Sequence, residues 1–104
     1  PSCAFGAFRD TIMAIFHCEC NYIPEIMNWA DMADILGLFA PRPLVVVAGK
    51  TDEIFPIKSA RSQFDRLKAI YRAAGAADNC RLVVGPEGHR FYARQGWDAL
   101  LKMI

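Results

Sequence analysis

The sequence predicts an α/β fold: a βαβα unit with parallel strands whose sheet is incomplete. Residues 44–47 (LVVV) form an unbroken β-branched run, which is typical of a strand buried on both faces. An amphipathic segment follows at 57–74, and a second short strand is expected at 81–84. Strand, helix, strand and helix at these lengths predict two parallel strands joined by a right-handed crossover. Two strands make no stable sheet alone, so the sheet needs further strands.

The first 20 residues give the least regular pattern. Residues 3–8 are small and apolar and are expected to end a strand, whereas residues 11–16 fit either a helical turn or a buried extended piece. Residues 21–40 are expected to be largely helical, with Pro24 in the first turn. The apolar side chains of that segment recur three or four residues apart, at Ile26, Trp29, Met32, Ala33 and Leu36.

Two carboxylates, Asp31 and Asp34, lie off this apolar stripe, so we expect them to face solvent. Gly37 and the sequence at 41–43 (PRP) end the segment.

The helix expected at 57–74 has the clearest period. Its apolar face comprises Ala60, Phe64, Leu67, Tyr71 and Ala74. Charged residues cover the opposite face and are expected to be solvated. Gly75 suits the left-handed conformation that ends many helices. A last helix is expected to have one apolar face, made of Trp97, Leu100, Leu101 and Ile104.

The charge pattern excludes some partners. Twelve basic and eleven acidic residues leave a net charge of +1, and the basic residues are scattered. Nucleic-acid binding needs a concentrated basic excess, so we expect no nucleic-acid partner. No apolar stretch approaches the roughly 18 residues that span a bilayer, so we expect no membrane partner either.

The hydrophobic content of 54% is high for 104 residues. A chain of this length buries only about two-thirds of its unfolded surface. Together with the abrupt start, this predicts that residues 1–104 form one partial domain. Its core would be completed by a missing N-terminal segment or by self-association.

An acid and a base follow the two expected strands. Asp52 comes after Gly49, just beyond the first strand, and His89 comes after Gly85 and Gly88, beyond the second. Parallel strands end at the same sheet edge, so the two side chains are expected to meet there. A carboxylate on Nδ1 fixes a histidine tautomer and leaves Nε2 free to take a proton from a nucleophile. The glycines are expected to allow the backbone path that brings the imidazole over the strand ends.

Other interpretations of these residues are less specific. An Asp after a Gly is often a turn former or a helix N-cap, and a lone His in a glycine-rich loop has many roles. The order acid then base, at equivalent ends of adjacent strands, favours a catalytic pair. Glu53 and Glu87 are weaker candidates for the acid.

The four cysteines, at positions 3, 18, 20 and 80, do not form a recognised metal or disulfide pattern. His17, Cys18 and Cys20 lack the spacing that brings ligands onto a tetrahedral ion, so buried packing thiols are the preferred interpretation. A cysteine nucleophile is also disfavoured. Cys18 is adjacent in sequence to its histidine, and Cys80 is expected at the strand end opposite His89.

Three stretches of the chain resemble the C-terminal third of α/β-hydrolases, specifically the acetyl xylan esterase-like branch related to dienelactone hydrolases. They are FRDTIMAIFHCECNYIPEI, NWADMADILGLFAPRPLVVVAGKTDEIFP and NCRLVVGPEGHRFYA. The most specific parts are APRPLVVVAGKTDEIFP and GPEGHRFY. The resemblance implies that Asp52 is the acid and His89 the base of a catalytic triad, and that no cofactor or metal is required.

The sequence departs from that family in having no G-x-S-x-G motif. Its serines, Ser2, Ser59 and Ser62, stand in no nucleophile-elbow context, so the nucleophile and the oxyanion donors would come from N-terminal sequence. The resemblance implies a small ester or an acetylated carbohydrate as substrate. Phe55 and Phe91 are candidates to line the acyl site, although phenylalanines near a sheet edge are more often core.

Two alternatives stay open. The chain could be a truncated module that associates or binds without turnover. It could also belong to an α/β-hydrolase of other specificity, such as a peptidase, lactonase or dehalogenase, because this fold supports many reactions.

Overall fold

The computed structural model describes residues 1–104 as a small α/β domain. The helices are α1 (Phe8–Ala14), α2 (Met32–Gly37), α3 (Ile57–Ala73) and α4 (Ala93–Leu101). The strands are β1 (Leu44–Gly49) and β2 (Cys80–Gly85), and three short 3₁₀ helices lie at Glu19–Asn21, Ile26–Asn28 and Ala77–Asn79. No helix combines the length and the apolar character that crossing a membrane requires.

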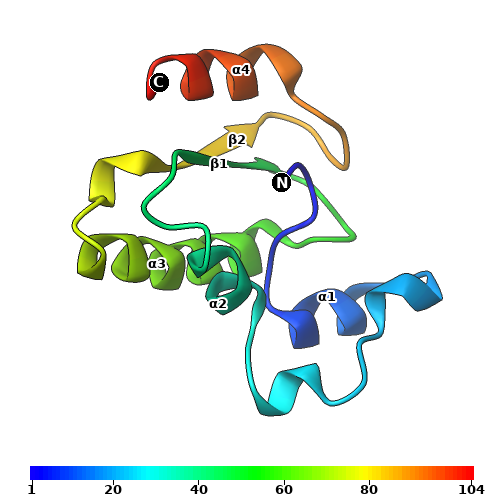
Figure 1. Ribbon diagram of the computed structural model, residues 1–104. Helices are drawn as coiled ribbons and strands as arrows, with labels where there is room; N and C mark the ends of the chain where they lie inside the picture. The colour runs from blue at the N-terminus through cyan, green and yellow to red at the C-terminus, as the bar shows by residue number, and fades with distance from the viewer.

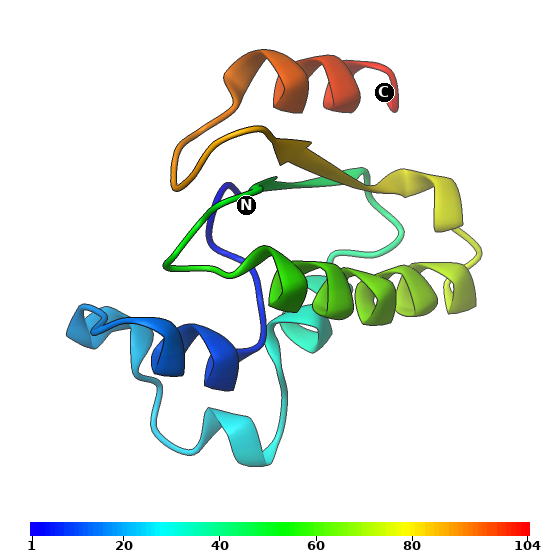
Figure 2. The ribbon, with the colours of Figure 1, turned by 180° about the vertical axis from the view of Figure 1, so that it is seen from behind.

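The two strands form a parallel pair between layers of helix. Leu44 pairs with Cys80 at one end and Gly49 with Gly85 at the other. Helices α2 and α3 lie on one face of the sheet and α4 lies on the other, as both ribbon views show (Figures 1 and 2). The predicted α/β class, the parallel pair and the helical connection between the strands are therefore confirmed.

The N-terminal residues lie against the free edge of β1. Val47 donates its N–H to Pro1 O at 2.9 Å, Cys3 donates its N–H to Val47 O at 2.8 Å, and Ser2 bridges Val47 in parallel. The strand end expected at residues 3–8 is therefore not found, because the pairing is a single bridge at Ser2 and α1 already begins at Phe8. The pairing places Cys3 at the sheet edge where β1 and β2 also end.

The core lies mainly between the sheet and α3. The predicted helix is confirmed almost to the residue, and Gly75 has the left-handed φ of 70° expected after it. On α3, Ala60, Leu67 and Tyr71 are fully buried, because a period of three or four residues aligns them on the face that meets β1. The Tyr71 hydroxyl donates to Arg42 O at 2.9 Å, so this large side chain has no unpaired polar group.

The prediction of a largely helical segment at 21–40 is wrong. The segment contains a six-residue helix, α2, preceded by a 3₁₀ turn. Glu25 has a φ of 61°, in the left-handed region, and Asp31 is extended, so neither can continue a helix. Asp31 instead starts α2 as its N-cap, in a reciprocal capping box with Asp34. Trp29, assigned to the buried stripe, is 85% exposed.

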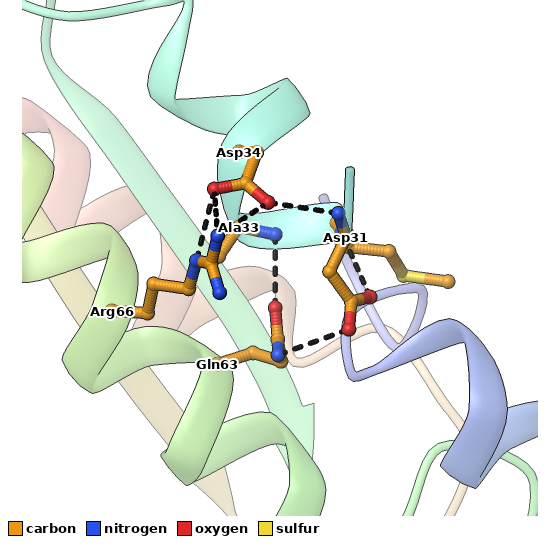
Figure 3. A network of polar contacts seen from close by, with 6 residues as sticks. Asp31, Ala33, Asp34, Gln63 and Arg66 are labelled. Carbon is orange, nitrogen blue, oxygen red and sulfur yellow. Dashed lines mark hydrogen bonds and ion pairs between the residues drawn. The ribbon is translucent and has the colours of Figure 1, made fainter. Parts of the chain in front are cut away.

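Asp31 and Asp34 are also not the solvated residues that the sequence predicts. Asp31 Oδ1 accepts from the N–H groups of Met32 and Phe8, each at 2.8 Å. Its Oδ2 accepts from Gln63 Nε2 at 3.3 Å (Figure 3). With the bond from Phe8, this carboxylate ties α1, α2 and α3 together. The N–H of Asp31 and the guanidinium of Arg66 both bond Asp34 and lower its pKa below the ordinary value.

Helix α4 covers the second face of the sheet incompletely. Gly96 is its buried residue, packed against Val47, whereas Trp97 and Leu101 are more than half exposed. The predicted apolar face is present, but no other part of the chain covers most of it. An apolar groove of about 350 Å³ runs between α4 and the edge of β1. Phe39, Val45, Phe91, Trp97 and Leu100 are among its lining residues.

Candidate catalytic site

Asp52 is held rigidly in the loop between β1 and α3. The N–H groups of Ile54 and Phe55 donate to Asp52 Oδ1 at 2.8 and 3.0 Å. The side chain is 1% exposed, so these bonds compensate for much of the hydration that the carboxylate loses on burial. With Oδ1 occupied by the backbone, Oδ2 is left to face the loop that follows β2.

His89 lies in that second loop and meets Asp52. Its Nδ1 is 3.0 Å from Asp52 Oδ2, within hydrogen-bonding distance, so the two side chains meet as expected. The imidazole is 45% exposed, and no protein atom forms a hydrogen bond with Nε2. Burial of the acid and exposure of the base leave Nε2 accessible from outside this chain.

An aromatic stack braces the imidazole. The ring of Phe55 lies nearly parallel to that of His89, with centroids 6.1 Å apart and an interplanar angle of 19°. On its other side Phe55 meets His17 edge-on, at 5.7 Å. His17 is buried, and its Nε2 is 2.7 Å from Thr11 O, to which it donates in the matching tautomer. His17, in the segment that follows α1, thus supports Phe55.

Backbone contacts join the two loops directly. Lys50 donates its N–H to Gly85 O at 2.9 Å, and Thr51 donates to Glu87 O at 3.1 Å. At Gly49 a Cβ would lie 2.2 Å from Gly88 O, closer than any real carbon–oxygen contact. A glycine at 49 therefore allows the strand end to approach the histidine loop.

Tyr92, which the sequence did not single out, fixes the shape of the histidine loop. Its buried hydroxyl accepts from the Glu87 N–H at 3.1 Å and donates to Gly88 O at 2.8 Å. A Cβ at Gly85 would overlap the Tyr92 ring at 2.2 Å. Neither Gly85 nor Gly88 has a positive φ, so the expected role of these glycines needs correction. Gly85 provides space for the tyrosine ring rather than an unusual backbone conformation.

Replacing Tyr92 by phenylalanine is expected to lower the free energy of unfolding by about 1–3 kcal/mol. The substitution keeps the ring but leaves the Glu87 N–H and the Gly88 carbonyl without their partner. Urea unfolding measures the loss, and hydrogen exchange at the Glu87 amide reports loop opening. Tyr22→Phe is the matched control. Its hydroxyl accepts a single long bond of 3.4 Å on a half-exposed side chain, so an equal loss there would contradict the assignment.

Cys3 is a second group that the sequence did not bring to the site. Its Sγ and the ligating atoms of Asp52 and His89 all lie within 4.8 Å of one another. The thiol donates to Arg90 O at 3.1 Å, and burial raises the pKa of Cys3 above its ordinary value. Cys3 reaches this position because residues 1–3 pair with Val47 of β1. In the sequence, the only feature that pointed to such a pairing was the small, apolar stretch at residues 3–8.

The remaining candidates lie away from this cluster. Glu53 is exposed, and Glu87 pairs with Arg90 at 2.6 Å, so neither competes with Asp52 for the imidazole. The expectation that Cys18 and Cys20 are buried packing thiols is wrong, because both are exposed, while the ring of their neighbour His17 is buried.

The three serines and Cys80 lie outside the cluster of Cys3, Asp52 and His89. Ser59 donates to Asp10 and accepts from the Ala7 N–H. Ser62 is exposed on α3, and Ser2 forms an isolated parallel bridge with Val47 of β1. Cys80 begins β2, and burial raises its pKa to about 11, which keeps it protonated and unreactive at neutral pH.

The two phenylalanines proposed for the acyl site differ. Phe55 is buried beside His89, and Phe91 is half exposed and lines the apolar groove against α4. Asp52 and His89 are not among the lining residues of that groove. The chain therefore holds a carboxylate–imidazole pair that can accept and return a proton, but does not wrap it in an apolar pocket.

Comparison with known proteins agrees with a hydrolase at a coarse level. A stretch of 68 residues, 65% of this chain, is 32% identical to the protein of Bacillus subtilis (strain 168) named "Putative hydrolase YtaP". The match spans 23% of that relative, so it corresponds to about a quarter of its length. No protein-family model matches the chain, and no solved structure matches it significantly. None of these comparisons supports the narrower resemblance to acetyl xylan esterases.

Proposed function

We propose that this chain supplies the acid and the base of a serine carboxylester hydrolase of the acetyl xylan esterase-like kind. The observation that carries the proposal is the 3.0 Å contact between Asp52 Oδ2 and His89 Nδ1 at the carboxyl ends of two parallel strands. The similarity to a Bacillus subtilis protein named as a hydrolase supports the same class of reaction.

The reaction is acyl transfer to water through a serine ester. His89 takes the proton of the serine hydroxyl on Nε2 and returns it to the departing alcohol. It then activates water in the same way to release the acid. Asp52 keeps the proton of the neutral imidazole on Nδ1 and stabilises the imidazolium that forms in each step. The backbone bonds to Asp52 Oδ1 keep this carboxylate from rotating away.

The serine and the oxyanion donors belong to a segment outside these 104 residues. The chain has no G-x-S-x-G motif, and the N–H donors of such enzymes follow the nucleophile and an upstream strand. The substrate is a small ester or an acetylated carbohydrate. The chain alone is expected to hydrolyse esters negligibly, because an acid and a base without nucleophile or oxyanion hole give little rate enhancement.

The proposal is tested with the full-length protein by hydrolysis of p-nitrophenyl acetate and labelling with phenylmethylsulfonyl fluoride. We expect hydrolysis that the reagent abolishes, and mass spectrometry should place the adduct on a serine other than Ser2, Ser59 and Ser62. A panel of acetylated xylan, lactones and peptide amides then separates the esterase from the other hydrolases. Absence of turnover with all of them would instead indicate a non-catalytic module.

A further inference from the structure

Three side chains that ligate transition metals converge at one sheet edge from three separate segments. Cys3 comes from the N-terminal segment beside β1, Asp52 from the loop after β1, and His89 from the loop after β2. We propose that their thiolate, carboxylate and imidazole form a binding site for Zn²⁺, with a water molecule as fourth ligand. The site overlaps the Asp52–His89 contact, so an ion bound there replaces that hydrogen bond.

The spacing of the three groups fits a zinc ion. In a tetrahedral site with bonds of about 2.0–2.3 Å, neighbouring ligand atoms are roughly 3.3–3.8 Å apart. The three ligand atoms here lie within 4.8 Å of one another, and Asp52 Oδ2 and His89 Nδ1 are 3.0 Å apart. Side-chain shifts of the order of 1 Å would therefore bring all three to bonding distance.

The surroundings favour an ion in this position. The backbone bonds to Asp52 Oδ1 orient the carboxylate as an outer shell does in metal sites. Cys3 and Asp52 are buried, so the thiolate that forms when Cys3 loses its proton beside Asp52 needs a cation to compensate the two charges. Zn²⁺ with one thiolate, one carboxylate and one neutral imidazole gives a net charge of zero. The half-exposed ring of His89 places one side of the cluster at the surface, from which the ion and its water ligand can enter.

Binding exchanges one bond for another at Cys3. The thiol that donates to Arg90 O loses its proton to solvent, and the sulfur forms a bond to zinc without any change of oxidation state. The imidazole proton of His89 moves from Nδ1 to the exposed Nε2, which frees Nδ1 to bind the ion. A bound ion removes Asp52 from His89 and should therefore inhibit hydrolysis. This consequence rests on the proposed function, whereas the metal site itself does not.

The test titrates the full-length protein with Co²⁺, whose thiolate complexes absorb in the near ultraviolet, and with Zn²⁺ in competition. We expect a thiolate–cobalt band in the wild type and in the control Cys18→Ser/Cys20→Ser, whose thiols are exposed and do not belong to the cluster. Cys3→Ser should lack the band and bind Zn²⁺ at least about tenfold more weakly, since even outer-shell changes cost about 10–100-fold.

Two further readouts keep the result unambiguous. His89→Gln, a change at a half-exposed side chain that should leave the fold intact, is expected to weaken Zn²⁺ binding by at least about tenfold as well. Zn²⁺ should inhibit ester hydrolysis by the wild type more strongly than by Cys3→Ser. A band that survives in folded Cys3→Ser, a band lost in the cysteine control, or no binding by the wild type would overturn the site. Binding without inhibition would leave the site standing and count against the proposed function.

Discussion

Replacing His89 by alanine is expected to lower kcat for ester hydrolysis by about 10⁴- to 10⁶-fold, the range measured for triads of other serine hydrolases. The alanine removes the group that carries the proton between serine, alcohol and water. The half-exposed imidazole contributes little to the core, so the melting temperature should change little. Initial rates with p-nitrophenyl acetate, together with a thermal melt, measure both quantities.

Asp52→Asn tests the same pair by changing its buried member, the acid. Asparagine can keep the two backbone bonds to Oδ1, but its amide then presents N–H to Nδ1 of His89. Nδ1 must accept that bond, which moves the imidazole proton to Nε2 and prevents it from acting as a base. We expect a loss of about 10⁴-fold in kcat with little change in KM.

Glu53→Gln is the matched control, since Glu53 is the adjacent acid but is exposed to solvent. Its rate should stay close to that of the wild type. Near-normal activity of His89→Ala or Asp52→Asn, in protein that still folds, would mean that the pair is not catalytic. A large loss in Glu53→Gln would move the acid to that residue.

The sequence was sufficient for the part of the fold that depends on local period and on strand direction. Residues 57–73 form the predicted helix because an apolar side chain recurs at each turn. Asp52 and His89 meet although 36 residues separate them, because parallel strands end at the same edge. Both conclusions follow from the local sequence pattern and the direction of the strands, without any information on which distant side chains touch.

Features set by distant partners could not be predicted in the same way. Asp31 interrupts the expected helix at 21–40 because it finds partners at Phe8 and Gln63, from two other helices. Cys3 reaches the site through pairing with Val47, and Tyr92 acts through a single hydroxyl. None of these contacts leaves a periodic trace in the sequence.

Gly49→Ala is expected to destabilise the protein by more than about 3 kcal/mol. The new Cβ would lie 2.2 Å from Gly88 O, a backbone atom that cannot move without its loop. Overpacking of this kind costs about 1–3 kcal/mol. Separation of the two loops would also weaken the Lys50–Gly85 and Thr51–Glu87 bonds, each contributing about 1 kcal/mol. Because the same loops carry Asp52 and His89, activity should fall along with stability.

Gly88→Ala is the control, since Gly88 is the other glycine of the contact between the two loops. It separates the effect of steric overlap from the effect of replacing a glycine. Its Cβ would have Thr51 O as nearest neighbour at 3.4 Å, an ordinary distance, and its φ is not positive. The substitution should leave stability unchanged or raise it by up to about 1 kcal/mol, since alanine restricts the unfolded chain. Urea unfolding of both variants decides the matter. Equal midpoints would show that the strand end does not need to approach the histidine loop as closely as the structure places it.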